Sequence, residues 1–226
     1  NSCIQLLSGM QANIAAYDAV LQPGDSVITT PCRHGGHYSH NKDGPLRLYR
    51  PRLLPIPFDE HTYNIDTQGL YSLIRKEQPK LLVIGWSEFL FPHPLSQIRE
   101  VCDKYGTRIM YDMSHVAGLI AGGEFQADAG RMADIVSSST GKSLHAPDHG
   151  LCLYNDDDLT GAINRAVQPL LTSNTHPHEI AALGVALVEM KTFGKDYAKQ
   201  VIQNAKSLGR SLANKGVHVL YGSQGY

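Results

Sequence analysis

The sequence lacks the features that mark several large classes of protein. Its 226 residues contain no apolar run near the ~20 residues that a membrane span needs, and no signal peptide is visible at the start. Lys and Arg number 20 against 21 Asp and Glu. The resulting net charge of −1 gives no reason to expect a nucleic acid or an anionic membrane as partner.

Cysteine is scarce and scattered, and no pair has the CxxC spacing. The four cysteines are Cys3, Cys32, Cys102 and Cys152. This pattern predicts free thiols in a cytoplasmic protein rather than a disulfide framework. The run His34-Gly-Gly-His37 has no second ligand cluster with zinc-like spacing, so no metal site is predicted.

Short apolar runs alternate with helical patterns along the chain, without repeats or low-complexity linkers. The predicted strands cover 26–29, 46–49, 53–56, 80–85, 108–112, 133–138, 151–154 and 217–221. The predicted helices cover 10–21, 67–76, 94–104, 158–166, 178–191 and 195–214. This alternation is typical of an α/β fold, with three α/β/α layers around a mostly parallel sheet. We expect one large domain.

Neither end of the sequence has the features expected of a natural chain terminus. Asn1 stands where an initiator Met would be, and residues 221–226 follow directly on a predicted strand. We therefore expect the chain to be the central part of a longer polypeptide.

A carboxylate and a lysine each follow a predicted strand. Asp112 ends the run Arg108-Ile-Met-Tyr-Asp, and Lys142 follows Ser-Ser-Ser-Thr-Gly after the next strand. Ligands of parallel sheets bind at these strand ends. Pyridoxal phosphate (PLP) needs such a pair, a lysine for a Schiff base and a carboxylate that holds a proton on the pyridine nitrogen. Taken alone, Lys142 could equally be an ordinary surface lysine and Asp112 an ordinary helix cap.

Other polar residues occur in an order that suits the same cofactor. Ser8-Gly9 precedes the first helix, where free backbone amides form a phosphate site, although an ordinary N-cap explains the pair equally well. His37 is better suited to stacking on an aromatic ring than to a metal, because its glycine neighbours allow close approach. His115 is placed to donate to the cofactor's phenolic oxygen, with a structural loop histidine as the alternative.

At this point the chain resembles the serine hydroxymethyltransferase family of fold-type I PLP enzymes over nearly its whole length. The matching segments are Ser8–Asn13 (family SGSQAN), Pro23–Asp25 (PGD), His34–His40 (HGGHLTH), Tyr111–Leu119 (VDMAHIAGL) and Thr140–Ser143 (THKT). The resemblance implies that residues 1–226 form the PLP-binding large domain. The family's N-terminal segment and C-terminal small domain, which carries a substrate-binding arginine, would then be missing.

The resemblance also implies roles for single residues. Lys142 would carry PLP, Asp112 would pair with the ring nitrogen, and His37 would stack on the ring. The remaining expected contacts are Ser87 and His115 near the ring oxygen, Ser8, Gly9, Met10 and Ser139 near the phosphate, and Ser173 and Asn174 in a loop that reaches the partner subunit's phosphate. A homodimer is implied.

The chain departs from the family pattern around the cofactor. Met10 replaces a phosphate-binding serine, and Gly141 replaces the histidine before the lysine. His145–His149 occupies the position of the family motif RGPRG, so two arginines are lost. Thr172–His176 occupies the position of the family motif QGGPL. Residues 171–176 and 189–198 are more similar to the threonine transaldolases, a second branch.

These departures lead to a main hypothesis and three alternatives. The main one is PLP-dependent Cα–Cβ cleavage and formation on serine, threonine or glycine through a quinonoid, with an aldehyde as acceptor, as in a transaldolase or specialised hydroxymethyltransferase. The alternatives are an ordinary folate-dependent serine hydroxymethyltransferase, a degenerate homologue that does not turn over, and, least favoured, an α/β binding domain without PLP.

Overall fold

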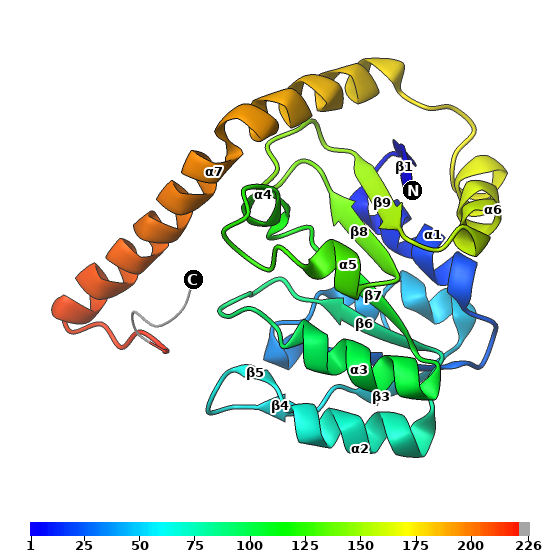
Figure 1. Cartoon of the computed structure of the whole chain (residues 1–226), viewed down its shortest axis with the longest axis horizontal. Helices are drawn as coiled ribbons and strands as arrows, with labels where there is room; N and C mark the ends of the chain where they lie inside the picture. Colours follow the sequence, from blue (N-terminus) through cyan, green and yellow to red (C-terminus); the bar gives the residue numbers. More distant parts are fainter. Residues whose placement is uncertain (222–226) are drawn as a thin grey trace.

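The computed structural model describes residues 1–221, which form a seven-stranded sheet with helices on both faces (Figure 1). The strands lie in the order β1-β9-β8-β7-β6-β2-β3, and β9 alone runs in the direction opposite to the other strands. The sheet strands are β1 (Ser2–Leu6), β2 (Ser26–Thr29), β3 (Arg52–Pro55), β6 (Leu81–Gly85), β7 (Arg108–Asp112), β8 (Ile135–Ser139) and β9 (Gly150–Tyr154). The predicted α/β class with a mostly parallel sheet is confirmed.

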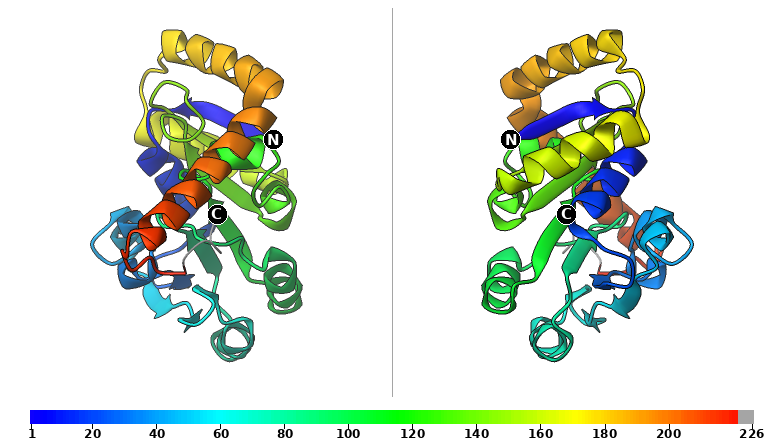
Figure 2. Two further views of the ribbon diagram at one scale, coloured as in Figure 1. Left: turned by 90° about the vertical axis from the view of Figure 1, so that its left-hand side faces the viewer. Right: turned by 90° about the vertical axis from the view of Figure 1, so that its right-hand side faces the viewer.

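The helices divide between the two faces of the sheet (Figure 2). One face carries α1 (Gly9–Val20) and α6 (Asp158–Arg165). The other carries α2 (Thr67–Glu77), α3 (Leu95–Tyr105), α4 (Ala117–Ala121), α5 (Ala129–Met132) and the first half of α7 (Pro177–Asn214). Short helices η1 (Cys32–His34), η2 (Tyr38–His40), η3 (Pro45–Tyr49) and η4 (Ala166–Leu171) lie in the connections.

Alternation along the central strands builds a separate core on each face. In β6, Leu81 and Val83 pack with α1 and α6, whereas Leu82 and Ile84 pack with α2 and α3. Successive side chains of a strand point to opposite faces, so a strand covered by helices on both sides must be apolar throughout. This is why the continuous apolar runs of the sequence indicate a parallel sheet.

Two predicted strands are wrong. Residues 46–49 belong to the 3₁₀ helix η3, which begins at Pro45 and ends at Tyr49, and the C-cap residue Arg50 has a left-handed φ of 45°. The segment belongs to the crossover between the parallel strands β2 and β3, which a tight turn cannot supply. Residues 217–221 form no strand either. Val217 instead donates its backbone N–H to the carbonyl of Leu212 at the end of α7.

The two helices predicted at 178–191 and 195–214 are one continuous helix, α7, of 38 residues. Residues 192–194, between the two predicted helices, continue the helix, and α4 packs against α7 at this point. A Cβ on Gly122, the C-cap of α4, would lie 2.4 Å from the Gly194 carbonyl oxygen. At 1.5 Å per residue α7 is about 57 Å long, and its second half extends beyond the sheet (Figure 1). None of the helices within residues 1–221 combines the length and apolar character needed to cross a bilayer.

Three strands were not predicted. β1 pairs antiparallel with β9, and Cys3 lies directly opposite Cys152. Short strands β4 (Phe58–Asp59) and β5 (Asn64–Ile65) form a hairpin outside the main sheet. Each is too short or too mixed in character for its sequence pattern to indicate a strand.

Candidate functional site

Asp112 ends β7 and lies on the floor of a cavity at the C-terminal edge of the sheet. Its side chain is only 8% exposed, yet both oxygens are satisfied. The Asn13 side-chain amide donates to Oδ2 at 2.9 Å, and His40 Nε2 lies 3.1 Å from the same oxygen. Ser114 donates to Oδ1 through its backbone N–H at 3.0 Å and its hydroxyl at 2.5 Å. The carboxylate is therefore held in one orientation.

These contacts decide the charge of Asp112. Burial by itself raises the pKa of this carboxyl, because it penalises the charged form. The hydrogen bond and charge of His40, together with the Ser114 hydrogen bonds, outweigh burial and hold the pKa well below its usual range. Asp112 is consequently an anion at neutral pH although its side chain is buried.

His40 is held on its other side by the rest of the fold. Its Nδ1 is hydrogen-bonded to the hydroxyl of Tyr17 in α1, and both side chains are buried. Its ring also lies against Gly85 at the end of β6, where an added Cβ would come 2.1 Å from Nε2. Only glycine leaves room for the imidazole at that position.

Lys142 and His115 form one wall of the cavity. Lys142 Nζ lies 3.2 Å from His115 Nε2. Burial, followed by the neighbouring charge of Lys142, lowers the pKa of His115. The imidazole is therefore neutral at pH 7 and is placed to exchange a proton with the amine.

His37 stands opposite, with its ring centroid 6.2 Å from that of His115. Its Nδ1 lies 2.7 Å from the hydroxyl of buried Ser39, which also accepts a hydrogen bond from Asn13. Burial, then the proximity of His40, lowers the pKa of His37 to about 4. A neutral, anchored imidazole of this kind can present its face to a flat ring.

The start of α1 closes the cavity at its third side. Ser8 is the N-cap and accepts a hydrogen bond from the backbone N–H of Gln11 at 3.2 Å. The first backbone amides of a helix have no intrahelical partner and attract anions. Gly9 allows β8 to approach, because a Cβ there would lie 2.9 Å from the Cβ of Ser139. This end suits a phosphate, although the Asp148 carboxylate lies close by, 3.3 Å from the Ser139 hydroxyl.

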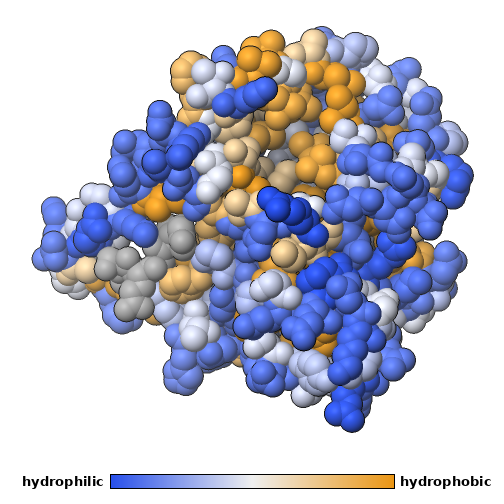
Figure 3. All heavy atoms as spheres, in the orientation of Figure 1, coloured by the Kyte–Doolittle hydropathy of each residue, from blue (hydrophilic) through white to orange (hydrophobic). Residues whose placement is uncertain are grey.

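The cavity enclosed by these groups has a volume of about 160 Å³. Its lining consists of Gly9, Met10, Asn13, His37, Tyr38, Asp112, Ser114, His115, Ser139 and Lys142. Larger hollows exist, including one of about 430 Å³ between α4 and α7 that is lined mainly by aliphatic side chains and lies under the apolar area in Figure 3. We place the site in the smaller cavity because the amine, the buried carboxylate and the imidazoles converge there.

Four of the predicted site residues do not line this cavity. Ser8 acts as the cap of α1, and Ser173 and Asn174 are exposed between η4 and α7. Ser87 lies at the same edge of the sheet, but its backbone N–H donates to Gly35 at 2.7 Å in the neighbouring loop.

Sequence reasoning missed three residues that hold Asp112, namely Asn13, His40 and Ser114. Asn13 had a detectable signal, because it is a polar residue on the alanine-rich, buried side of α1. The other two are ordinary loop residues in the sequence and meet Asp112 only in the fold.

The groups around the cavity fit PLP. The amine of Lys142 is reachable, the anionic Asp112 lies at the floor with its donors fixed, and a helix start is available for a phosphate. Imine formation, proton exchange and the binding of a protonated ring nitrogen are the chemistry that this set of side chains supports.

Comparison with known proteins agrees with this chemistry. The family model described as serine hydroxymethyltransferase matches residues 1–225. Proteins named serine hydroxymethyltransferase include one from Methanobrevibacter smithii, 40% identical over 99% of this chain and 53% of the relative. Those from Pyrobaculum calidifontis (40% identical; 95% of this chain, 50% of the relative) and Picrophilus torridus (42%; 97% and 51%) are similar.

Proposed function

Because the chain belongs to the serine hydroxymethyltransferase family, we propose that it is the cofactor-binding large domain of an enzyme that transfers a hydroxymethyl group between serine and glycine, with a folate as carrier. The chain spans about half the length of the curated relatives it matches. The observation that carries the proposal is the convergence of Lys142, His115, His37 and the anchored Asp112 on one cavity.

Enzymes of this family use PLP. When bound, PLP supplies an electron sink for the charge that develops at the Cα of an amino acid when a bond to that carbon breaks. Asp112 is the residue of this chain that makes the sink effective, since its negative charge keeps a proton on the ring nitrogen. Asn13, His40 and Ser114 act through Asp112 as positioning residues.

The other residues of the cavity have roles that follow from their contacts. Lys142 provides the amine that links covalently to PLP, and His115 accepts or returns a proton at Lys142 Nζ, 3.2 Å away. His37 would lie against the ring when PLP is bound, and it stays neutral above its pKa of about 4, so it would add no positive charge there.

Cleavage of threonine, followed by transfer of the glycine-derived carbanion to a second aldehyde, is the second candidate. It is supported by the altered segment around Lys142, where Asp148 brings a carboxylate next to Ser139. The relatives named above favour the ordinary folate-dependent reaction, which the sequence alone ranked below the transaldolase. A homologue without turnover is third, and the intact Asp112 and Lys142 geometry opposes it.

We also propose a homodimer in the cytoplasm. The exposed segment Ser173–Asn174 supports the first part, because it adds nothing to the cavity of its own chain and is free to contact another. All four cysteines are free thiols, as in proteins of a reducing compartment.

The deciding experiment supplies the full polypeptide that carries this chain with PLP and tests two reactions. Serine and tetrahydrofolate should give glycine at a rate that depends on folate. Threonine and an added aldehyde, without folate, should give no more than a minor yield of a new β-hydroxy amino acid. If only the threonine reaction proceeds, the transaldolase is correct, and if neither does, the homologue without turnover is correct.

A further inference from the structure

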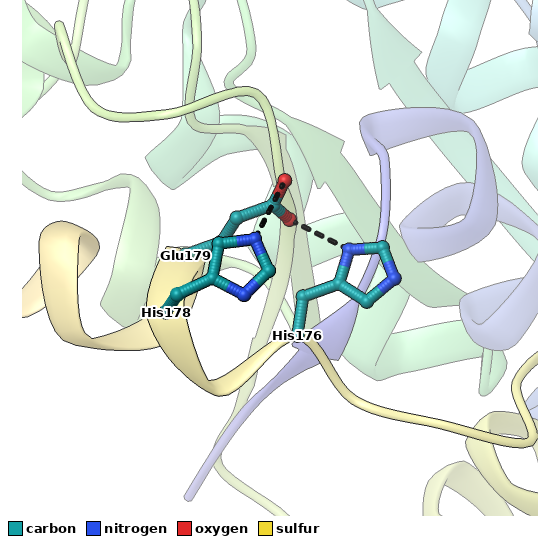
Figure 4. A group of neighbouring side chains, drawn as sticks. All are labelled: His176, His178 and Glu179. Carbon is teal, nitrogen blue, oxygen red and sulfur yellow. Dashed lines mark hydrogen bonds and ion pairs between the residues drawn. The ribbon is translucent and has the colours of Figure 1, made fainter.

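A second group of titratable side chains lies at the start of α7, outside the cavity described above. His176, His178 and Glu179 each offer one ligand atom, and these three atoms lie within 4.8 Å of one another. Glu179 Oε2 is 3.0 Å from His176 Nδ1, and Oε1 is 4.0 Å from His178 Nε2. Figure 4 shows the two imidazoles on either side of the carboxylate.

These separations suit a small divalent cation. In a tetrahedral zinc site the ligands lie ~2.0–2.1 Å from the metal, so neighbouring ligand atoms are about 3.3 Å apart. His176 Nδ1 and Glu179 Oε2 are already closer than that, and His178 Nε2 and Glu179 Oε1 are about 0.7 Å farther apart. All three ligand atoms lie within 4.8 Å of one another, so binding an ion requires the two imidazoles to rotate toward each other by up to about 1.5 Å.

The backbone that carries the three ligands is already fixed. His176 is the N-cap residue, Pro177 occupies the first helical position, and His178 and Glu179 follow in the first turn of a 38-residue helix. The N–H groups of Glu179 and Ile180 both donate to the carbonyl of His176. Little backbone entropy is therefore lost when a metal binds.

A buried histidine supports the group from behind. The side chain of His149 is 0% exposed, and its Nδ1 lies 3.0 Å from Glu179 Oε2. Its Nε2 lies 3.0 Å from the carbonyl oxygen of Ile4 in β1, so polar contacts on both sides of the ring fix its orientation. Metal sites use such residues behind the ligands to fix their orientation.

Surface ion pairing of Glu179 with His176 and with the buried His149 accounts for only part of this arrangement, because it gives His178 no role. The rings of His176 and His178 stand nearly parallel, 16° apart with centroids separated by 5.7 Å. Both imidazoles therefore lie within reach of one ion held by Glu179.

We propose that His176, His178 and Glu179 bind a zinc-type divalent cation, with His149 as a positioning residue for Glu179. Imidazole and carboxylate ligands suit Zn²⁺, and three protein ligands leave a fourth place for water. The proposal is independent of the reaction proposed for the cavity. Sequence spacing alone did not indicate it, because the two histidines and the glutamate fall within four residues at a helix start.

The test is a titration of the full polypeptide that carries this chain with Co²⁺, followed by displacement with Zn²⁺. One equivalent of Co²⁺ should give visible absorption of a tetrahedral centre that Zn²⁺ abolishes. His178→Ala and Glu179→Gln should each weaken binding at least tenfold. His149→Asn should weaken it 10–100-fold, as for other residues behind metal ligands.

The matched control is His61→Ala, which removes an exposed histidine far along the sequence from this group. It should bind as tightly as the unchanged chain, and circular dichroism checks that every variant is folded. The proposal is overturned if no visible band forms, or if His178→Ala and Glu179→Gln bind Co²⁺ like the control. His178 is 78% exposed, so its variant is expected to fold even where the His149 variant does not.

Discussion

His40 Nε2 lies 3.1 Å from Asp112 Oδ2, and the two side chains are 1% and 8% exposed. They come from different parts of the sheet edge, since His40 ends η2 and Asp112 ends β7. The contact with His40 helps to keep the Asp112 carboxylate charged although it is buried. A buried carboxylate must stay charged to bind a protonated ring nitrogen, and burial opposes that charge.

Removing His40 should therefore weaken both the fold and cofactor binding. His40→Ala leaves a buried carboxylate with fewer partners, which should lower the free energy of unfolding by about 1–3 kcal/mol. It should also raise the pKa of Asp112 and weaken PLP binding severalfold. Denaturant unfolding and fluorescence titration with PLP measure the two effects, and His61→Ala should change neither. A variant that binds PLP as tightly as the unchanged chain would show that His40 has no positioning role.

Asp112 should make stability depend on pH in a defined direction. Its pKa in the folded chain is below the unfolded value of about 3.9, so its stabilisation is complete above that value and is lost as pH falls. The difference in unfolding free energy between the unchanged chain and Asp112→Asn should shrink from pH 6 to pH 3. Asp59→Asn, which alters an exposed carboxylate, should show a smaller trend. A difference independent of pH would contradict the assigned charge.

Gly9 should tolerate no side chain. A Cβ at this position would lie 2.9 Å from both the Cβ and the backbone N of Ser139, so Gly9→Ala must push α1 away from β8. We expect a loss of about 1–3 kcal/mol of stability, as in other overpacked sites, and at least tenfold weaker PLP binding. Gly184→Ala is the matched control, because its Cβ meets nothing within 4 Å on a helix and should be neutral or stabilising. Equal behaviour of the two variants would refute close packing at the start of α1.

Asp148 should oppose the phosphate of the cofactor. Its carboxylate lies 3.3 Å from the Ser139 hydroxyl, at the end of the cavity that the helix start makes favourable for an anion. Asp148→Asn removes this charge and should tighten PLP binding about two- to tenfold, since the side chain is exposed and screened by salt. The gain should fall at high ionic strength. Weaker binding of PLP by the variant would mean that Asp148 accepts a proton or hydrogen bond from the cofactor.

The sequence predicts the central strands of the fold well for a specific physical reason. Strands β6 and β7 are covered on both faces, so every residue from Leu81 to Ile84 must be apolar, and such runs are visible without a structure. Residues 46–49 (Leu-Arg-Leu-Tyr) alternate apolar and polar side chains as a half-buried strand does, but they form η3, because the crossover between two parallel strands decides their conformation. The long helix α7 was predicted as two helices with a gap at residues 192–194, and the packing of this segment against Gly122 after α4 is not visible in the sequence.

The candidate site was predictable in part. Asp112 and Lys142 were indicated because they follow strands, and strand ends of a parallel sheet share one edge. Asn13 and His40 were not, because their partner Asp112 is 99 and 72 residues away and no local pattern records such a contact. Ser87 shows the limit of the strand-end rule, since it follows β6 at the correct edge but does not line the cavity, and its backbone N–H donates to Gly35 of a neighbouring loop.

The most direct test of the account is chemical trapping of PLP on the 226-residue chain. The chain is mixed with PLP, reduced with borohydride, digested and mapped by mass spectrometry, with Lys142→Ala as control. The account predicts one dominant label on Lys142, and a folded Lys142→Ala variant that takes up none at stoichiometric PLP. Labels spread over other lysines, or equal labelling of Lys142→Ala, would contradict the placement of the cofactor beside Asp112.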